Sequence, residues 1–138
     1  MTLKAEGRLG EGVTCMLQTG KALVEAGLHP ATGGSGLSVC SGDMLLEALV
    51  ACTGVTLGAV APAIGVVRAE GDLDFRGTLG VSKDAPVGFQ RIRLRFELNT
   101  DASEEQLATL LRLTERYCVV FQTLRQPPEM SSSCKKGS

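Results

Sequence analysis

The stretch from Ala48 to Val67 contains no charged residue, and it constrains the fold of this 138-residue chain more than any other feature. Together with the residues before it, this stretch predicts a helix over 43–61 that is apolar on nearly every side, with Asp43 and Glu47 as its only charges. A helix without a polar face is either buried on all sides or lies in a membrane. A chain of this length forms about one domain and has few other elements to cover such a helix, so we expect a buried central helix within an oligomer.

A membrane-spanning helix is the alternative interpretation of this segment. The segment is long enough to cross a bilayer, and Gly54-Val55-Thr56-Leu57-Gly58 has the spacing of a helix-packing motif. However, Thr53, Thr56 and Pro62 lower its hydrophobicity, and no basic cluster flanks it. We therefore expect no membrane partner. Because no apolar leader follows a basic start, we expect a cytoplasmic protein.

The composition excludes several classes of partner. Lys and Arg number 14 against 15 Asp and Glu, aromatic residues make up 4%, and Trp is absent. Such a chain has neither the basic surface nor the stacking side chains of a nucleic-acid-binding protein. His29 is the only histidine, which excludes sites that need two histidines from one chain. We expect no nucleic-acid partner, no metal and no cofactor.

Strand patterns lie on both sides of the predicted helix. Short strands are predicted over 2–8, 13–18 and 21–26, followed by a long loop over 28–42. After the helix, apolar residues alternate with charged ones over 67–75 and again over 91–98. Two half-buried strands of this kind form an antiparallel pair. The acidic outer residues of the first and the arginines of the second should then form ion pairs across the strands.

A second helix is predicted to begin at Asp101, with Glu104 completing a capping box. Its apolar residues recur with helical spacing as far as Cys118, and the pattern continues to Pro127. This spacing places Cys118 on the buried face of one continuous helix.

The five cysteines include no C-x-x-C pair, which argues against a disulfide framework and a ribbon-type zinc site. Cys52 and Cys118 each lie on an apolar face of a predicted helix. Neither lies in a first turn, so we expect no activation by a helix dipole. One interpretation is a pair of buried, inert thiols. The other is a peroxide-reducing pair, in which a thiolate becomes a sulfenic acid that condenses with the second thiol.

The residues around both cysteines resemble the OsmC/Ohr family. The segment from Ser41 through Ala51-Cys52 resembles the helix that leads to that family's reactive cysteine. The sequence Cys118-Val119-Val120-Phe121-Gln122-Thr123-Leu124 resembles its second-cysteine motif, and the order of elements between the two also matches. The resemblance covers residues 1–130, which we expect to form a single domain, followed by a polar, disordered tail over 131–138.

The resemblance implies an α+β fold with antiparallel sheets, a buried central helix and an intertwined homodimer. It also implies a thiol peroxidase that reduces organic hydroperoxides, with Cys52 as the peroxidatic and Cys118 as the resolving cysteine. The reductant would be a dithiol or a lipoyl-bearing protein. Arg8 is the best match to the family arginine that stabilises the thiolate, since a nearby cation lowers the pKa of a thiol.

The sequence departs from the family pattern at two positions near these cysteines. Gly42 stands where the family has the glutamate that pairs with its arginine, and Asp43 is the candidate replacement. Val119 stands where the family has proline. These changes keep open a non-catalytic OsmC-like protein that binds a small ligand in an apolar pocket around Cys52. Cys15, Cys40 and Cys134 match no family motif and are expected to be structural or incidental. His29, in the loop before the helix, is expected to be a solvated loop residue, the alternative being that it lines the entrance of the pocket.

Overall fold

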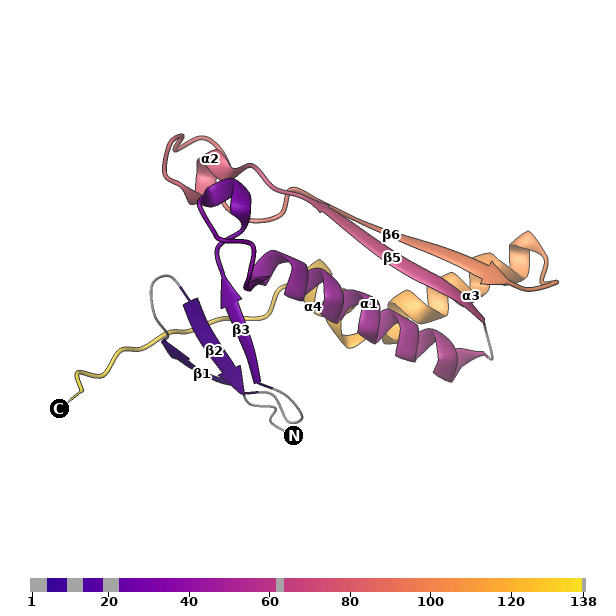
Figure 1. Ribbon diagram of the computed structural model, residues 1–138. Helices are drawn as coiled ribbons and strands as arrows, with labels where there is room; N and C mark the ends of the chain where they lie inside the picture. Colours follow the sequence, from indigo (N-terminus) through magenta and orange to yellow (C-terminus); the bar gives the residue numbers. More distant parts are fainter. Residues whose placement is uncertain (1–4, 10–13, 19–22, 62–63, 138) are drawn as a thin grey trace. The chain divides into compact units, whose positions relative to one another are not determined.

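The computed structural model describes residues 5–9, 14–18, 23–61 and 64–137 (Figure 1). The contacts between residues divide the chain into two units. The first unit comprises Met1–Ala48 and Arg68–Arg95, and the second comprises Leu49–Val67 and Phe96–Ser138. Three elements, α1, β5 and β6, contribute residues to both units.

The first unit contains a four-stranded sheet in the order β1-β2-β3-β4. Its antiparallel part consists of β1 (Glu6–Leu9), β2 (Thr14–Gln18) and β3 (Leu23–Gly27). These strands confirm the three predicted ones where the chain is described. The expectation of purely antiparallel sheets is wrong for β4 (Val39–Cys40), which pairs with β3 in parallel. The connection between them returns the chain along the sheet, so β4 runs in the direction of β3.

The connection from β3 to α1 is more ordered than the predicted long loop. The short 3-10 helix η1 (Pro30–Thr32) follows His29, whose Nδ1 accepts a hydrogen bond from the Ala31 N–H at 3.0 Å. Proline at the first helical position fits this start, since its missing N–H would have no partner there. Gly33 ends η1 with a φ of 99°, a left-handed conformation that glycine adopts without strain.

Strands β5 (Ile64–Asp72) and β6 (Arg91–Asn99) form a two-stranded sheet. Asp72, at the end of β5, accepts a hydrogen bond from the Gln90 N–H at 2.9 Å, just before β6 begins. At the other end of the ladder, a Cβ on Gly65 would overlap the Glu97 carbonyl oxygen. This register is antiparallel, as the alternating pattern predicts.

Ion pairs cross this ladder as expected. The Arg93 guanidinium lies 2.7 Å from Asp72 and 3.4 Å from Glu70. Strand β5 ends three residues before the predicted end, because Asp74 accepts a hydrogen bond from the Arg76 N–H at 3.0 Å and starts the short helix α2 (Phe75–Thr78). Phe75 therefore belongs to a helix and not to the strand.

Two helices replace the single second helix that the sequence predicts (Figure 1). The first, α3 (Glu104–Tyr117), starts at a capping box formed by Ser103 and Gln106, two residues later than the one expected at Asp101. Cys118 then adopts an extended conformation, with φ −78° and ψ 115°, and α4 (Val119–Arg125) follows. The prediction of one continuous helix is wrong because Cys118 serves as the N-cap of α4, ahead of two β-branched valines with low helix preference.

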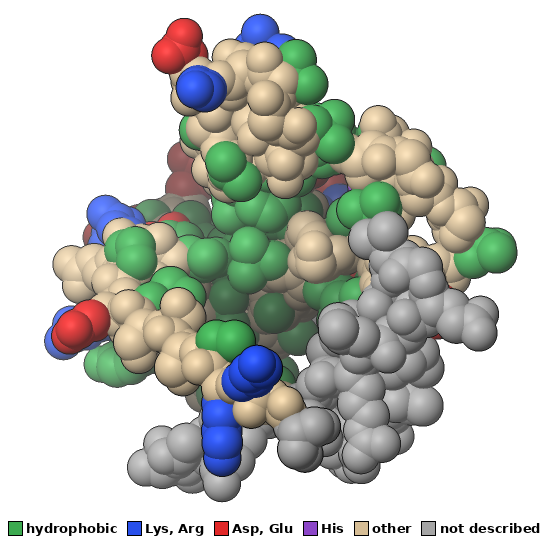
Figure 2. Space-filling model, turned by 90° about the vertical axis from the view of Figure 1, so that its left-hand side faces the viewer, with side chains coloured by type: hydrophobic (Ala, Val, Ile, Leu, Met, Phe, Trp, Pro, Cys, Tyr) green, Lys and Arg blue, Asp and Glu red, His purple; other side chains and the backbone are tan. Residues whose placement is uncertain are grey.

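Helix α1 (Ser41–Val60) confirms the predicted helix. Its length and mean hydropathy of 1.6 would also suit a membrane span, properties that the core helix of a soluble protein shares. Within one chain, its fully buried residues are a single stripe, Leu49, Thr53 and Leu57. Val55 is 75% exposed, and the space-filling view shows hydrophobic side chains at the surface (Figure 2).

Candidate functional site

The structure places the thiols of Cys52 and Cys118 close enough within the second unit for each to influence the pKa of the other. Cys52 lies on α1, and Cys118 lies at the junction of α3 and α4. Cys118 has no exposed surface, whereas Cys52 is half-buried, and both are free thiols. The two cysteines that the sequence singles out therefore form one site.

Backbone hydrogen bonds on both sides fix the position of Cys118. Its N–H donates to the Thr114 carbonyl at 3.0 Å, the last bond of α3, and its carbonyl accepts from the Gln122 N–H at 3.0 Å in α4. Its Sγ accepts from the Phe121 N–H at 3.4 Å. The sulfur thus satisfies an amide that would otherwise lack a partner in the first turn of the helix.

Four neighbouring groups lower the pKa of the Cys52 thiol: the backbone N–H groups of Val119 and Val120, the thiol of Cys118 and the hydroxyl of Thr56. Thr56 lies one helical turn after Cys52, and its hydroxyl donates to the Cys52 carbonyl at 2.7 Å. These donors come from two helices, so the site depends on α1 and α4 together.

The pKa of the Cys52 thiol lies below its ordinary value. Desolvation by burial is the largest single influence and raises this pKa, because it disfavours the charged form. The four donors each stabilise the thiolate, and together they outweigh the desolvation. The expectation that no helix end activates the cysteine is wrong, since the break at Cys118 directs the first amides of α4 to Cys52.

The pKa of the Cys118 thiol lies above its ordinary value. Desolvation is again the largest influence, and the negative charge of Cys52 adds to it. Cys118 also donates its proton to Cys52, which further favours its neutral form. The N–H groups of Phe121 and Val120 act in the opposite direction and do not compensate. The pair is therefore asymmetric, because Cys52 loses its proton at a lower pH than Cys118 does.

Arg8 and Asp43, the other predicted site residues, belong to the first unit. Arg8 lies in β1 opposite Met16, and its side chain is outside the described part of the chain. Asp43 lies exposed in the first turn of α1. Among the described residues, its carboxylate has no hydrogen-bond or ion-pair partner. Cys15 lies in β2, and its side chain is likewise outside the described residues.

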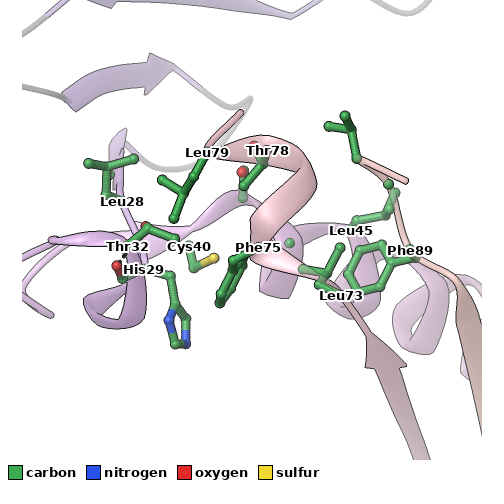
Figure 3. Close-up of a pocket in the computed structure, with 15 residues that line it drawn as sticks. Leu28, His29, Thr32, Cys40, Leu45, Leu73, Phe75, Thr78, Leu79 and Phe89 are labelled. Carbon is green, nitrogen blue, oxygen red and sulfur yellow. Dashed lines mark hydrogen bonds between the residues drawn. The ribbon is translucent and has the colours of Figure 1, made fainter. Parts of the chain in front are cut away.

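A cavity of about 410 Å³ lies in the first unit (Figure 3). Its wall is mainly apolar and includes Leu28, Leu45, Leu73, Phe75, Leu79, Val87 and Phe89. Gly42 also lines it, and a Cβ there would lie 3.4 Å from the Phe89 ring and 3.8 Å from the Cys40 sulfur. Figure 3 shows the Cys40 thiol directed toward Phe75. The missing side chain at position 42 therefore leaves room for a small molecule.

His29 and Cys40 both line this cavity. The His29 ring is half-buried and lies 5.5 Å from that of Phe75, so this loop histidine lies at the wall of the cavity, which is the alternative that the sequence left open. Cys134 is exposed. Over the part of the chain that the structure describes, no group of three or more His, Cys, Asp or Glu residues is arranged to hold a metal ion.

Sequence reasoning missed three contributors to the thiol site: Thr56, Val119 and Val120. A hydroxyl four residues after a cysteine in a helix is a visible signal, because it lies on the same face. The two valines contribute backbone amides, and the pattern of side chains in a sequence does not indicate which backbone amides face a site. Only the break of the helix at Cys118 exposes them.

The asymmetry of the thiol pair predicts the order in which the two cysteines react with iodoacetamide. Alkylation requires the thiolate, so the alkylation rate at each cysteine rises with pH, and the midpoint of this rise reports the pKa of that thiol. The midpoint for Cys52 should lie below that of free N-acetylcysteine. The midpoint for Cys118 should lie above it. Peptide mass spectrometry of the reduced protein after timed alkylation measures each site separately. Equal midpoints, or the reverse order, would contradict the asymmetric pair.

Comparisons with known proteins agree with this fold. The chain has a TM-score of 0.75 and 16% identity to an OsmC-like protein from Mycoplasma pneumoniae, covering 92% of this chain and 89% of that one. It has a TM-score of 0.69 and 16% identity to a hypothetical protein from Aquifex aeolicus VF5, with coverages of 92% and 90%. For the organic hydroperoxide resistance protein OhrB of Bacillus subtilis, the TM-score is 0.60 and the identity 18%, with coverages of 92% and 93%. At these identities, the likeness concerns the fold alone.

No curated protein matches the chain in a sequence comparison. The family profile described as OsmC-like protein matches residues 34–133, a span that contains both Cys52 and Cys118. This span is well over half of the 138 residues. The resemblance noted around the two cysteines is therefore confirmed, and the chain belongs to the OsmC-like protein family.

Proposed function

We propose that this protein is a cysteine-based thiol peroxidase that reduces organic hydroperoxides. The observation that carries the proposal is the asymmetric pair, in which the pKa of the Cys52 thiol is lowered and that of the neighbouring Cys118 thiol is raised. A thiol that ionises readily beside a thiol that keeps its proton suits two successive steps, attack on the peroxide and then attack on the oxidised sulfur. Membership of the OsmC-like family, and the fold shared with an organic hydroperoxide resistance protein, support the same chemistry.

In the first step, the Cys52 thiolate attacks one peroxide oxygen, and an S–O bond forms as the O–O bond breaks. The sulfur is oxidised to sulfenic acid, and the other oxygen leaves as an alkoxide. The alkoxide takes up a proton to become the alcohol. Cys118 holds the nearest thiol proton to this centre.

In the second step, Cys118 attacks the sulfenic acid, which forms the Cys52–Cys118 disulfide and expels hydroxide. The first step prepares this attack, because it removes the negative charge on Cys52 that raises the pKa of Cys118. The pKa of Cys118 therefore falls only after Cys52 has been oxidised, so Cys118 becomes a good nucleophile when its target, the sulfenic acid, is present. An external dithiol or a lipoyl-bearing protein then reduces the disulfide to two thiols and becomes oxidised itself.

Arg8 and Asp43 belong to the same proposal in subsidiary roles. A guanidinium near the Cys52 sulfur would lower its pKa further and would orient the peroxide. Asp43 would bind the guanidinium of Arg8, in place of the family glutamate whose position Gly42 occupies. Both roles come from the resemblance and not from contacts of described side chains.

The peroxidase proposal predicts different outcomes for the two cysteine variants. Cys52→Ser should abolish hydroperoxide consumption, because a hydroxyl is close in size but does not ionise at neutral pH. Cys118→Ser should consume one equivalent of cumene hydroperoxide and then stall, with Cys52 trapped as a sulfenic acid that dimedone labels. Peroxide consumption and mass spectrometry measure both outcomes.

The exposed Cys134 provides the matched control, since Cys134→Ser removes a thiol outside the site. This variant should turn over like the wild type. If peroxide produces no disulfide in the wild type and no sulfenic acid in Cys118→Ser, the protein is not a thiol peroxidase.

We also propose that the protein acts as a homodimer in the cytoplasm. Beyond its buried stripe, α1 exposes Ala51, Val55, Gly58 and Ala59 on one side. A Cβ placed on Gly54 or Gly58 would meet no atom within 4 Å, so another helix could approach closely there. Burial of this apolar surface against a second copy contributes about 25 cal/mol per Å².

The dimer proposal predicts a specific effect of Val55→Glu. The wild type should sediment as a dimer at low micromolar concentration, and Val55→Glu should weaken the dimer at least about 100-fold, since each copy loses a buried valine worth about 1.5 kcal/mol or more. Met130→Glu is the control, because Met130 is also largely exposed but lies beyond α4. A wild type that sediments as a monomer would refute the dimer.

The cavity in the first unit favours a second candidate function, the binding of a small ligand without catalysis. Its volume of about 410 Å³ and apolar wall suit an uncharged apolar molecule. The alternative inferred from the sequence placed the pocket around Cys52, whereas this cavity lies elsewhere, around Gly42 and Cys40. A thiol count after one equivalent of hydroperoxide separates the two functions. Loss of two thiols per chain supports the peroxidase, and retention of all thiols supports the binding protein.

The cavity predicts that Gly42→Leu reduces the binding of a neutral apolar dye such as N-phenyl-1-naphthylamine. A leucine side chain would fill the space beside Phe89 and Leu73, whereas the single methyl group of Gly42→Ala would leave most of it open. Fluorescence titration compares the two variants with the wild type. Equal dye binding in Gly42→Leu and Gly42→Ala would show that the dye does not occupy this cavity.

A further inference from the structure

The cavity in the first unit separates polar from apolar lining residues. Figure 3 shows His29, Thr32 and Cys40 at one end and Leu73 and Phe89 at the other. Among the described residues that line it, none is Asp, Glu, Lys or Arg, and the polar side chains are those of His29, Thr32, Cys40, Ser41 and Thr78. A charged ligand would remain unpaired here, which is costly away from water. The wall therefore favours an uncharged molecule with one polar end.

Hydrogen bonds within the loop fix the polar end of the cavity. The hydroxyl and the N–H of Thr32 both donate to the His29 carbonyl at 2.9 Å. Nδ1 of His29 accepts from the Ala31 N–H at 3.0 Å, so the hydrogen of the neutral imidazole lies on Nε2. This end therefore offers a donor, the His29 Nε2–H, and an acceptor, the Thr32 hydroxyl oxygen. A hydroxyl group both donates and accepts, so it complements the two.

The ring of Phe89 closes the apolar end of the cavity. A Cβ on Gly71 would overlap this ring, so glycine at that position allows the ring to lie against the backbone of β5. From the side of α1, a Cβ on Gly42 would lie 3.4 Å from the same ring. Leu45 and Leu73 complete this end. A hydrocarbon group is stabilised by burial against these side chains.

We propose that this cavity binds an apolar alcohol, with its hydroxyl group at the end formed by His29 and Thr32 and its hydrocarbon part against Phe89. The proposal deepens the second candidate function, since it rests on ligand binding in this cavity and adds the chemical class and the orientation of the ligand. It does not depend on peroxide reduction at Cys52.

The first test compares octan-1-ol with octanoate, which share the length of their carbon chain and differ in charge. Displacement of N-phenyl-1-naphthylamine from the wild type measures both affinities at neutral pH. Octan-1-ol should bind at least about 100-fold more tightly, because the carboxylate would lie unpaired in the cavity. Equal displacement by the two would overturn the proposal. If the dye itself binds less in Gly42→Leu than in Gly42→Ala, the candidate binding function would still stand.

Three cysteines report where the alcohol binds. Cys40 lines the cavity, Cys52 belongs to the thiol site and Cys134 is exposed. Octan-1-ol at ten times its Kd should slow the alkylation of Cys40 by iodoacetamide about tenfold, and it should leave the rates of Cys52 and Cys134 unchanged. Peptide mass spectrometry measures the three rates in one sample. Protection of Cys52 without protection of Cys40 would overturn the proposal, because the alcohol would then lie at the thiol site.

The orientation of the alcohol is tested by Thr32→Val, which removes the acceptor and nearly keeps the shape of the side chain. The affinity for octan-1-ol should fall about fivefold, the effect of one hydrogen bond. Thr109→Val is the matched control, because the Thr109 hydroxyl donates to the Glu105 carbonyl in α3, within the second unit. This control should bind octan-1-ol like the wild type. An unchanged affinity in Thr32→Val would overturn the proposal.

Discussion

The coupling between the Cys52 and Cys118 thiols is the interaction on which the candidate site depends. It gives two chemically identical side chains opposite pKa shifts, since the Cys118 thiol lowers the pKa of Cys52 and Cys52 raises that of Cys118. Burial alone would raise the pKa of both thiols and leave both unreactive. Amides at the start of α4 lower the pKa of both thiols, and the difference comes from the pair itself, because the Cys118 thiol lowers the pKa of Cys52 while Cys52 raises that of Cys118.

This arrangement requires the helix to break at Cys118, and the break is what the sequence does not reveal. Apolar residues keep helical spacing across the break, so periodicity predicts one continuous helix and correctly places Cys118 in the interior. A cysteine as N-cap is not among the preferred capping residues, so no familiar signal marks the start of α4. The capping box at Ser103 and Gln106 differs from the prediction by two residues for a similar reason, since several acidic and hydroxyl residues near Asp101 compete for the cap.

Helix α1 and the paired strands could be predicted almost completely, because their patterns are long and repeat without interruption. The absence of a polar face on α1 indicates that something must cover it, and one chain buries only Leu49, Thr53 and Leu57 fully. What covers the other side depends on a partner surface, and sequence periodicity carries no information about that. The cavity was also missed, because it is formed by four separate segments that only the fold brings together around Gly42.

The two departures from the family pattern act in opposite directions on the same chemistry. Gly42 removes a carboxylate and leaves an apolar space, so a charged side chain contributes less to the site. Val119 keeps a backbone N–H that proline would lack, and this N–H is one of the groups that lower the pKa of the Cys52 thiol. A backbone amide is fixed by the fold itself, whereas a charged side chain needs partners that hold it in place. The lowered pKa of Cys52 therefore depends on the backbone geometry at the break between α3 and α4.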